Sequence, residues 1–407
     1  MHAVPRAVAI GLLAALAATP AHALSLRDRF SATAQRVGLT GGGAFDALGD
    51  AIADTAARNL PVISASAGFT YQYNPQLEVF ERTSDTLGPI FLERPDTLGR
   101  GKFNVNVSFQ YVELNEIDGT PTNRLESRDP VVSRVVEAAT GTLLGFTADR
   151  LRYNFKLINH IAGVSLTYGV LDNLDVNLFV PVIFTNFDVT ANRDTLFAAG
   201  PDGVFNPAPA HFEPGTLRGQ KNGIGDILIR AKYQLPRMDI WRSALGLQLR
   251  LPSGDEANFQ GTGNFEASPF FYASTILWSR VEPHANVGLD LRSDDVSKSQ
   301  ARYGVGVDAD VTRRIGLALG FLGRSQFSAS ASPSDTAFLH LTPSGTTALE
   351  PLLGIDFARK DFFDLSFGAR AVVWRQIMVF ANGIYALNDD GLRNDSIIPV
   401  VGLEGTF

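Results

Sequence analysis

The chain has 407 residues, of which 45% are hydrophobic, and it contains no cysteine. Without cysteine it can form no disulfide framework, no thiolate metal site and no cysteine nucleophile. Its 42 acidic and 35 basic residues give a formal net charge of −7. The sequence therefore lacks the basic surplus that nucleic-acid backbones attract, and we expect no nucleic-acid partner.

Residues 1–23 have the pattern of a cleaved secretory signal peptide. Arg6 provides a basic start, an apolar run covers Ala7–Ala18, and an Ala-His-Ala sequence ends the segment. An N-terminal membrane anchor is the alternative, but the run is shorter than the roughly 20 apolar residues that a spanning helix needs. We therefore expect export from the cytoplasm, with the mature chain beginning near Leu24.

The next segment, 24–100, contains a predicted amphipathic helix between Gly43 and Leu60. Its apolar residues recur at helical spacing and its charged residues lie on the opposite face; the two sets are Phe45, Leu48, Ile52 and Ala56, and Asp46, Asp50, Asp54 and Arg58. We interpret the segment as a plug that enters a barrel from the periplasm and gates it. A helix across the periplasmic mouth and a mobile linker are the alternatives, because helices this short are marginal unless packed.

From Lys102 to Val112, apolar and polar residues alternate strictly, which indicates a β-strand with one apolar and one polar face. The pattern recurs along the chain, and short turns alternate with long polar connections, as in bacterial outer-membrane barrels. Counted by this rule, twelve strands are predicted, at about 102–114, 149–170, 173–189, 223–236, 239–252, 265–279, 283–293, 299–311, 313–326, 362–373, 375–386 and 396–407.

A transmembrane barrel explains these segments better than a soluble β-sandwich. Many run to ten residues or more, which a tilted membrane strand needs, and an open sheet edge in lipid would leave backbone groups unpaired. We therefore predict an all-β fold, a closed antiparallel barrel over 101–407 with both ends of the chain in the periplasm. Segments 61–73 and 351–358 also resemble strands, so fourteen strands is the alternative. We interpret them as a periplasmic or edge segment and as part of a folded outer loop.

The chain stops on Phe407, at the end of an alternating strand. A terminal aromatic residue resembles the C-terminal signal that the barrel-assembly machinery reads, although a chain can also end in phenylalanine by chance. We expect an outer-membrane location, with that machinery and outer-membrane lipid as partners.

Several stretches resemble a family of outer-membrane proteins named for the MetA pathway of phenol degradation, whose members are often called transporters. The resemblance covers about 150–407. It is carried by Tyr168–Val176, Val180–Val182, Gly223–Tyr233, Leu249–Glu256, Gly261–Gly263, Pro283–Gly288, Leu387–Arg393 and Ile398–Glu404. The resemblance implies a barrel fold and does not identify a transported compound.

Charged residues of both signs fall on the polar faces of the predicted strands, and we predict that they line the lumen. They are Lys102, Arg152, Lys156, Arg230, Lys232, Arg250, Arg292, Arg302, Arg324 and Arg370, with Asp175, Asp226, Asp290, Asp308, Asp310, Asp364 and Glu404, and we add His284 as a hydrogen-bonding residue. They either pair across strands, because unpaired buried charge is costly, or select a polar or anionic aromatic solute.

The sequence gives little support for an enzyme. His160 and Ser165 are the nearest hydrolase pair, but their odd spacing places them on opposite faces of a strand, and the chain has no Gly-x-Ser-x-Gly motif. The glycines of Gly261–Gly263 lack the Gly-Lys-Ser/Thr of a phosphate loop. No residues have convincing metal spacing. We therefore predict no catalytic, cofactor or metal site, and the sequence disfavours an outer-membrane phospholipase.

We predict a channel that passes small hydrophobic or aromatic solutes passively through the charged lumen, without a cofactor. The alternative is a structural or adhesive barrel, because the predicted outer loops at 115–148, 190–222 and 326–361 are long. Three phenylalanines in the second loop could bind a partner or guide a solute: Phe197, Phe205 and Phe212.

Overall fold

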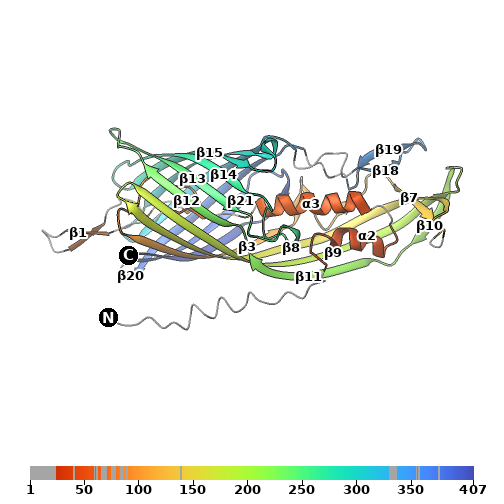
Figure 1. The fold of residues 1–407 in the computed structure, drawn as a ribbon, viewed down its shortest axis with the longest axis horizontal. Coiled ribbons are helices and arrows are strands. Elements are labelled where there is room, and N and C mark those ends of the chain that lie inside the picture. The colour runs from red at the N-terminus through yellow and green to blue at the C-terminus, as the bar shows by residue number, and fades with distance from the viewer. Residues whose placement is uncertain are drawn as a thin grey trace.

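Twelve antiparallel strands form a closed barrel in the computed structural model (Figure 1). The structure describes residues 24–39, 42–58, 60, 63–65, 71–74, 79–82, 87, 90–137, 140–329, 337–353, 355, 358–374 and 376–407. The barrel strands are β3 (Phe103–Leu114), β8 (Leu143–Leu171), β9 (Leu174–Ala199), β12 (Ile227–Gln234), β13 (Trp241–Leu251), β14 (Glu266–Thr275), β15 (Val281–Arg292), β16 (Gln300–Asp310), β17 (Ile315–Gln326), β20 (Asp361–Trp374), β21 (Ile377–Ala386) and β23 (Ile398–Thr406). The ring closes where Val401 of β23 pairs with Phe109 of β3.

These strands confirm the prediction of a closed barrel and all twelve predicted segments. Neither additional strand-like segment joins the barrel in the described residues. Part of 61–73 lies outside them, and its last residues belong to β1 (Tyr71–Asn74), which pairs only with β2 (Val79–Arg82). Residue 351 ends β19 (Thr347–Pro351), which forms a hairpin with β18 (Ala337–Leu341) inside a long connection. The predicted signal peptide also lies outside the described residues.

The outer surface of the barrel carries the apolar face of every alternating strand. On β9, Val176, Leu178 and Phe184 are exposed outside, whereas Asp175 and Asn177 are buried inside. The three tryptophans of the chain are also exposed, all at the end with the short turns, and they are Trp241, Trp278 and Trp374. An apolar band with an aromatic border is the surface that a transmembrane barrel presents to lipid.

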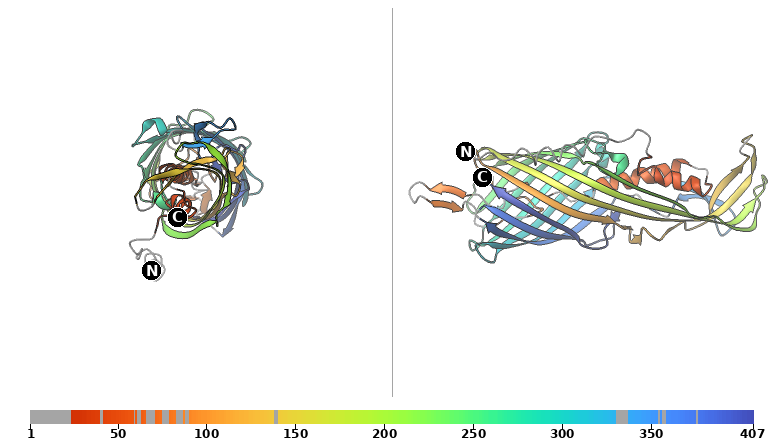
Figure 2. Two further views of the ribbon diagram at one scale, coloured as in Figure 1. Left: turned by 90° about the vertical axis from the view of Figure 1, so that its right-hand side faces the viewer. Right: turned by 90° about the horizontal axis from the view of Figure 1, so that it is seen from below.

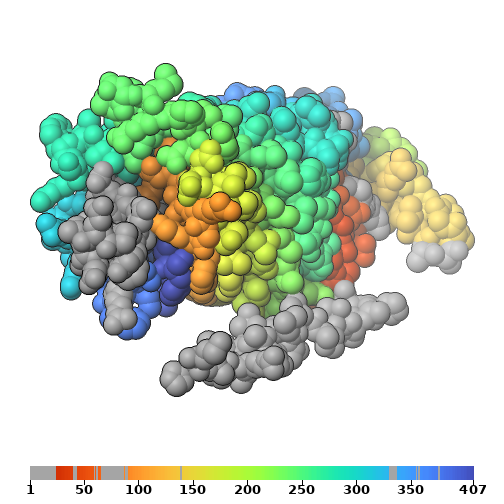
Figure 3. Space-filling view, turned by 60° about the vertical axis from the view of Figure 1, so that its left-hand side comes forward, coloured from red at the N-terminus to blue at the C-terminus, as the bar shows by residue number. Residues whose placement is uncertain are grey.

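Strands β8 and β9 extend beyond the barrel at the opposite end, which carries the long connections and is called here the long-loop end. They continue in a sheet with β7 (Val131–Val136), β10 (Phe205–His211) and β11 (Gly215–Ile224). Figure 2 shows this extension projecting past the rim, and Figure 3 shows it as the gold and green region beyond the barrel body. Much of the predicted loop sequence at 115–148 and 190–222 is therefore strand.

The two faces of the long strands exchange their chemistry where they leave the barrel. On β9 the outward residues change from apolar, ending at Phe184, to polar, as at Asp188 and Thr190, while the inward residues become apolar, as at Phe187 and Val189. The same exchange occurs on β8. The same alternate positions face outward on both sides of this change, so a shift of register does not cause it. We interpret it as the level at which the outer face of the strands passes from lipid to water.

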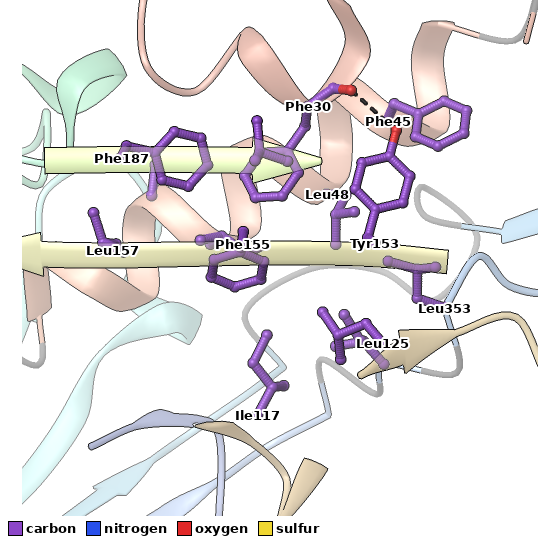
Figure 4. Close-up of a cluster of buried hydrophobic side chains, with 14 of the residues drawn as sticks. Phe30, Phe45, Leu48, Ile117, Leu125, Tyr153, Phe155, Leu157, Phe187 and Leu353 are labelled. Atoms are coloured by element: carbon purple, nitrogen blue, oxygen red, sulfur yellow. Dashed lines mark hydrogen bonds between the residues drawn. The ribbon is translucent and has the colours of Figure 1, made fainter. Parts of the chain in front are cut away.

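Two helices pack against the apolar inner face of the extension and form a hydrophobic core with it. They are α2 (Arg29–Arg36) and α3 (Gly42–Arg58). The Phe30 ring lies 5.4 Å from that of Phe155 and 5.3 Å from that of Phe187, and the Tyr153 hydroxyl donates a hydrogen bond to the carbonyl of Phe30 at 3.1 Å (Figure 4). No helix among the described ranges is long and apolar enough to span a membrane.

The helices lie at the long-loop end, which differs from the expected entry through the short-turn end. Leu26 donates its backbone N–H to Asn258 Oδ1 at 3.0 Å, and Arg58 Nη1 donates to the carbonyl of Lys298 at 3.1 Å. Both acceptors belong to connections at this end, within η2 (Glu256–Asn258) and η3 (Val296–Lys298). The amphipathic pattern predicts a helix but contains no information about which end it occupies.

Replacing Phe30 by alanine should detach α2 from the wall. Truncating a fully buried phenylalanine costs about 3–5 kcal/mol, and Phe30 is 0% exposed. We expect trypsin to cleave the folded variant after Arg36 much faster than it cleaves the unmodified protein. Phe327→Ala is the matched control because Phe327 is 48% exposed. Equal cleavage rates for Phe30→Ala and the control would show that this core does not hold the helix.

Candidate functional site

The N-terminal segment continues from α3 into the lumen and bonds to its wall. Its described residues 60, 63–65, 87 and 90–98 include carbonyl groups that accept hydrogen bonds from side chains on β8, β12 and β20, and one backbone N–H group that donates to β9. These bonds run from Thr167 Oγ1 to the Ala65 carbonyl (3.0 Å), from Arg230 Nη1 to the Ile63 carbonyl (3.0 Å), from Lys232 Nζ to the Arg94 carbonyl (3.0 Å), from Arg370 Nη1 to the Leu87 carbonyl (3.0 Å) and from Leu98 N to the Asp175 carboxylate (2.9 Å).

One apolar contact fixes this segment against the opposite wall. The Leu92 side chain lies over Gly304 and Gly306 of β16, where an added Cβ would approach it to 2.5 and 2.8 Å. Glycine is required at such a close approach because any side chain would displace the leucine. The segment therefore crosses the lumen with contacts on several sides.

Of the eighteen residues predicted to line the lumen, fifteen point inward and three do not line it. The inward group comprises Asp175, Asp226, Arg230, Lys232, Arg250, His284, Asp290, Arg292, Arg302, Asp308, Asp310, Arg324, Asp364, Arg370 and Glu404. Lys102 lies at the rim before β3. Arg152 and Lys156 lie on the outer face of the extension, paired with Asp194 at 2.6 Å and Glu113 at 3.2 Å.

The prediction for Arg152 and Lys156 is wrong because it assumes that the polar face of a strand is always the inner face. In the extension the inner face is covered by α2 and α3, so apolar residues face inward and charged residues face water. His160 and Ser165 lie on opposite faces as predicted.

Most inward charges are paired with a partner on another strand or on the N-terminal segment. These pairs include Arg242–Asp96 (2.5 Å), Arg242–Glu282 (2.7 Å), Arg302–Asp290 (2.8 Å), Arg292–Asp54 (2.8 Å), Arg393–Asp364 (2.9 Å), Arg250–Glu266 (3.1 Å) and Arg370–Glu404 (3.4 Å). Pairing across strands therefore accounts for most of the charge in the lumen, as buried charge requires.

The end of α3 is part of this network. The Asp54 carboxylate accepts hydrogen bonds from Arg58 Nε at 3.2 Å and from Arg292 Nη1 at 2.8 Å. Burial raises the pKa of Asp54 above its usual range, and the adjacent Arg292 opposes this shift. These bonds attach the helix to the rim of the barrel through β15.

A cavity of about 170 Å³ lies between residues 58, 60, 63, 64 and 91–93 on one side and the wall from β12 to β23 on the other. Among the described residues, six arginines line it, Arg58, Arg230, Arg250, Arg302, Arg324 and Arg393, together with two carboxylates, Glu93 and Asp364. The Phe270 and Tyr272 rings, stacked with their centroids 5.7 Å apart, form part of the lining. Positive charge and aromatic surface thus meet in one cavity of the lumen.

Arg230 and Arg324 differ from the other arginines of the cavity. Within the described part of the chain, neither guanidinium has a carboxylate oxygen within 4.0 Å. Arg230 donates to Gln248 Oε1 and to the Ile63 carbonyl, both at 3.0 Å, and Arg324 donates to the Arg58 carbonyl at 3.0 Å. Their charge is therefore not neutralised by a direct ion pair.

The strand pattern could not predict that three particular residues line the cavity. The sequence predicts Arg58 on the polar face of a helix. Arg393 lies in the short strand β22 (Leu392–Arg393), and Glu93 belongs to the segment inside the lumen. The helical pattern did identify Arg58 as a polar residue. Its position against the lumen depends on tertiary packing.

The structure gives the Gly-Thr-Gly stretch a structural role. The backbone N–H groups of Thr262 and Gly254 donate to the Asp226 carboxylate at 2.8 and 3.1 Å. These amides are thus used by a carboxylate of the chain itself. Among the described residues, no group of three His, Asp or Glu side chains could hold a metal ion.

Comparisons with solved structures find β-barrels of the outer membrane. An outer membrane channel from Pseudomonas putida F1 has 11% identity, covers 77% of this chain and 98% of its own, and gives a TM-score of 0.47. A deletion mutant of the monoaromatic hydrocarbon channel TodX has 9% identity, with coverages of 84% and 96% and a TM-score of 0.38. A FadL homologue from Pseudomonas aeruginosa has 13% identity, with coverages of 75% and 89% and a TM-score of 0.33.

No curated protein sequence matches the chain significantly. A family model described as the MetA-pathway of phenol degradation matches residues 170–373, from the end of β8 to the end of β20. This match covers half of the chain and agrees with the resemblance seen in the sequence. The chain belongs to the MetA-pathway of phenol degradation family.

Proposed function

We propose that this protein is an outer-membrane channel that passes small hydrophobic or aromatic solutes passively through its lumen. The observation that carries the proposal is a closed barrel with an apolar band outside and a partly aromatic cavity inside. The family description, which refers to phenol degradation, supports an aromatic solute. The channel needs no cofactor and performs no catalysis.

The extension and the long connections face the cell exterior, and the short turns face the periplasm, as in bacterial outer-membrane barrels. Residues 24–100 form the plug of the barrel at 101–407, and they regulate access to the cavity from the outside. The supporting observation is that the described part of this segment is held on the wall by hydrogen bonds. Such contacts can break and form again during solute passage.

The outer-membrane location also gives the C-terminal strand a partner, the barrel-assembly machinery. Phe407 follows β23, and its ring stacks on that of Phe103 with the centroids 5.2 Å apart. The two rings lie at the seam where the last strand closes on the first. An exposed aromatic at this seam is available for recognition before closure.

An adhesive barrel is the second candidate, supported by the extension outside the membrane band. Its phenylalanines are partly engaged, since Phe197 and Phe205 pack on a cluster with Val132 and Leu341, and Phe212 lies 4.4 Å from the Arg193 guanidinium. This reduces the apolar surface that they offer to a partner.

Uptake of radiolabelled aromatic solutes by cells with and without the gene separates the two functions. The channel predicts slower uptake at low external concentration in cells that lack the protein, and restoration by a plasmid copy. Normal uptake of every solute together with reduced binding to surfaces would contradict the channel and favour the adhesive barrel.

A further inference from the structure

The cavity contains more cationic donors than the chain can satisfy. Among the described residues, Arg230 and Arg324 have no carboxylate oxygen within 4.0 Å. The buried Nε of Arg302 donates to no hydrogen-bond acceptor in the described residues. Nη2 of Arg58 makes no hydrogen bond there either, although Glu266 Oε1 lies at an ion-pair distance of 3.6 Å. Buried donors without acceptors are costly, and one anion accepting from several of them would remove that cost.

Two of these arginines are direct neighbours. Arg302 on β16 pairs in register with Arg324 on β17, so both side chains project into the lumen from adjacent positions. Like charges at directly opposed positions of a sheet are destabilising. Only Arg302 has a carboxylate, Asp290 at 2.8 Å. The Arg324 guanidinium instead lies 4.7 Å from the centroid of the Phe362 ring, which Arg393 also approaches, to 5.2 Å.

The size and lining of the cavity limit the anion that it can hold. Pockets for drug-sized ligands span about 300–1,000 Å³, whereas this cavity measures about 170 Å³, near the volume of about 150 Å³ that accommodates benzene. The stacked Phe270 and Tyr272 rings offer an aromatic surface, with the Arg302 guanidinium 5.5 Å from the Phe270 centroid. A single ring with a small charged substituent fits these features.

We propose that the cavity is a binding site for a single-ring aromatic carboxylate. Arg230 and Arg324 bind the carboxylate because they are the cavity arginines without an ion pair, and the aromatic lining packs against the ring. Guanidinium groups suit this task, since their planar donors match a carboxylate in two parallel hydrogen bonds. The inference rests on the proposed function and specifies its substrate class.

Equilibrium dialysis of radiolabelled benzoate against the purified full-length protein in detergent tests the site. We expect Arg230→Gln and Arg324→Gln each to raise the dissociation constant by about 10-fold or more, since each removes a hydrogen bond to a charged group. Arg324→Lys keeps the charge and should retain part of the affinity. Arg218→Gln is the matched control, because that side chain is 79% exposed on β11 and lies outside the lumen.

Competing ligands test separately whether the carboxylate group and the aromatic ring of the proposed substrate contribute to binding. Benzyl alcohol lacks the carboxylate and acetate lacks the ring, so we expect each to displace benzoate poorly. Equal affinity for either competitor and benzoate would overturn the assignment, as would benzoate affinity unchanged in both glutamine variants or no measurable benzoate binding.

Proteoliposome flux separates failure of this inference from failure of the proposed function. Passage of both benzoate and benzyl alcohol, with benzoate passage reduced in the two glutamine variants, supports the site. Passage of benzyl alcohol without benzoate contradicts the site and leaves the channel intact. Passage of neither solute contradicts the channel itself.

Discussion

We expect a chain that lacks residues 24–58 to have a single-channel conductance several-fold higher than the full-length protein. This deletion removes α2 and α3 from the long-loop end, together with the Arg292–Asp54 and Arg58–Glu266 pairs that attach α3 to the wall. A twelve-strand barrel is wider than the eight-strand barrels whose side chains fill the interior, so water should enter the space that the helices leave. Planar-bilayer recordings measure the change.

A cysteine tether provides the control, since the chain has no cysteine of its own. A Cβ added at Gly215 of β11 would lie 3.0 Å from the Cβ of Arg36 on α2, so a disulfide there needs a shift of roughly 1 Å. The Arg36→Cys/Gly215→Cys protein should keep a low conductance when oxidised. Equal conductance of the deleted and full-length proteins would contradict a plug at this end.

The second large effect is expected on the lipid-facing surface. Val180→Arg on the outer face of β9 should reduce the free energy of unfolding by about 2–4 kcal/mol, which is the cost of an arginine near the bilayer midplane of a barrel. Val180 lies between the exposed residues Leu178 and Phe184 of the apolar band. Denaturant unfolding in lipid vesicles, followed by tryptophan fluorescence, measures the difference.

Thr190→Arg is the matched control, on the same face of the same strand. Thr190 lies beyond the position where the outward residues become polar, so its replacement should change the free energy of unfolding by less than about 1 kcal/mol, as for a residue near the interface. Equal destabilisation by both arginines would contradict the membrane boundary placed after Phe184.

The barrel strands could be predicted because two independent patterns agree. The alternation of apolar and polar residues predicts each strand. The alternation of short and long connections predicts that consecutive strands pair with each other, in a closed barrel with an even number of strands. The register, for example Val401 opposite Phe109, follows once the last strand meets the first. These features depend on local sequence and on the requirement that no edge remains in lipid.

The lumen could be predicted only in part. The alternation of apolar and polar residues correctly places Arg230 and Asp290 inside, but it misplaces Arg152. The pattern does not show whether the inner face of a strand contacts charged partners or an apolar helix. The contacts of Arg58 and Glu93 join segments far apart in the chain. Such contacts depend on which end the N-terminal segment enters, and no periodic pattern encodes that choice.

Solute entry into proteoliposomes containing the purified full-length protein tests the central claim most directly. The claim is that small aromatic solutes cross the barrel through its lumen. We predict that these vesicles take up small aromatic solutes faster than protein-free vesicles, and that uptake increases further with the protein lacking residues 24–58. Uptake equal to that of protein-free vesicles, for both proteins and every solute, would contradict the account.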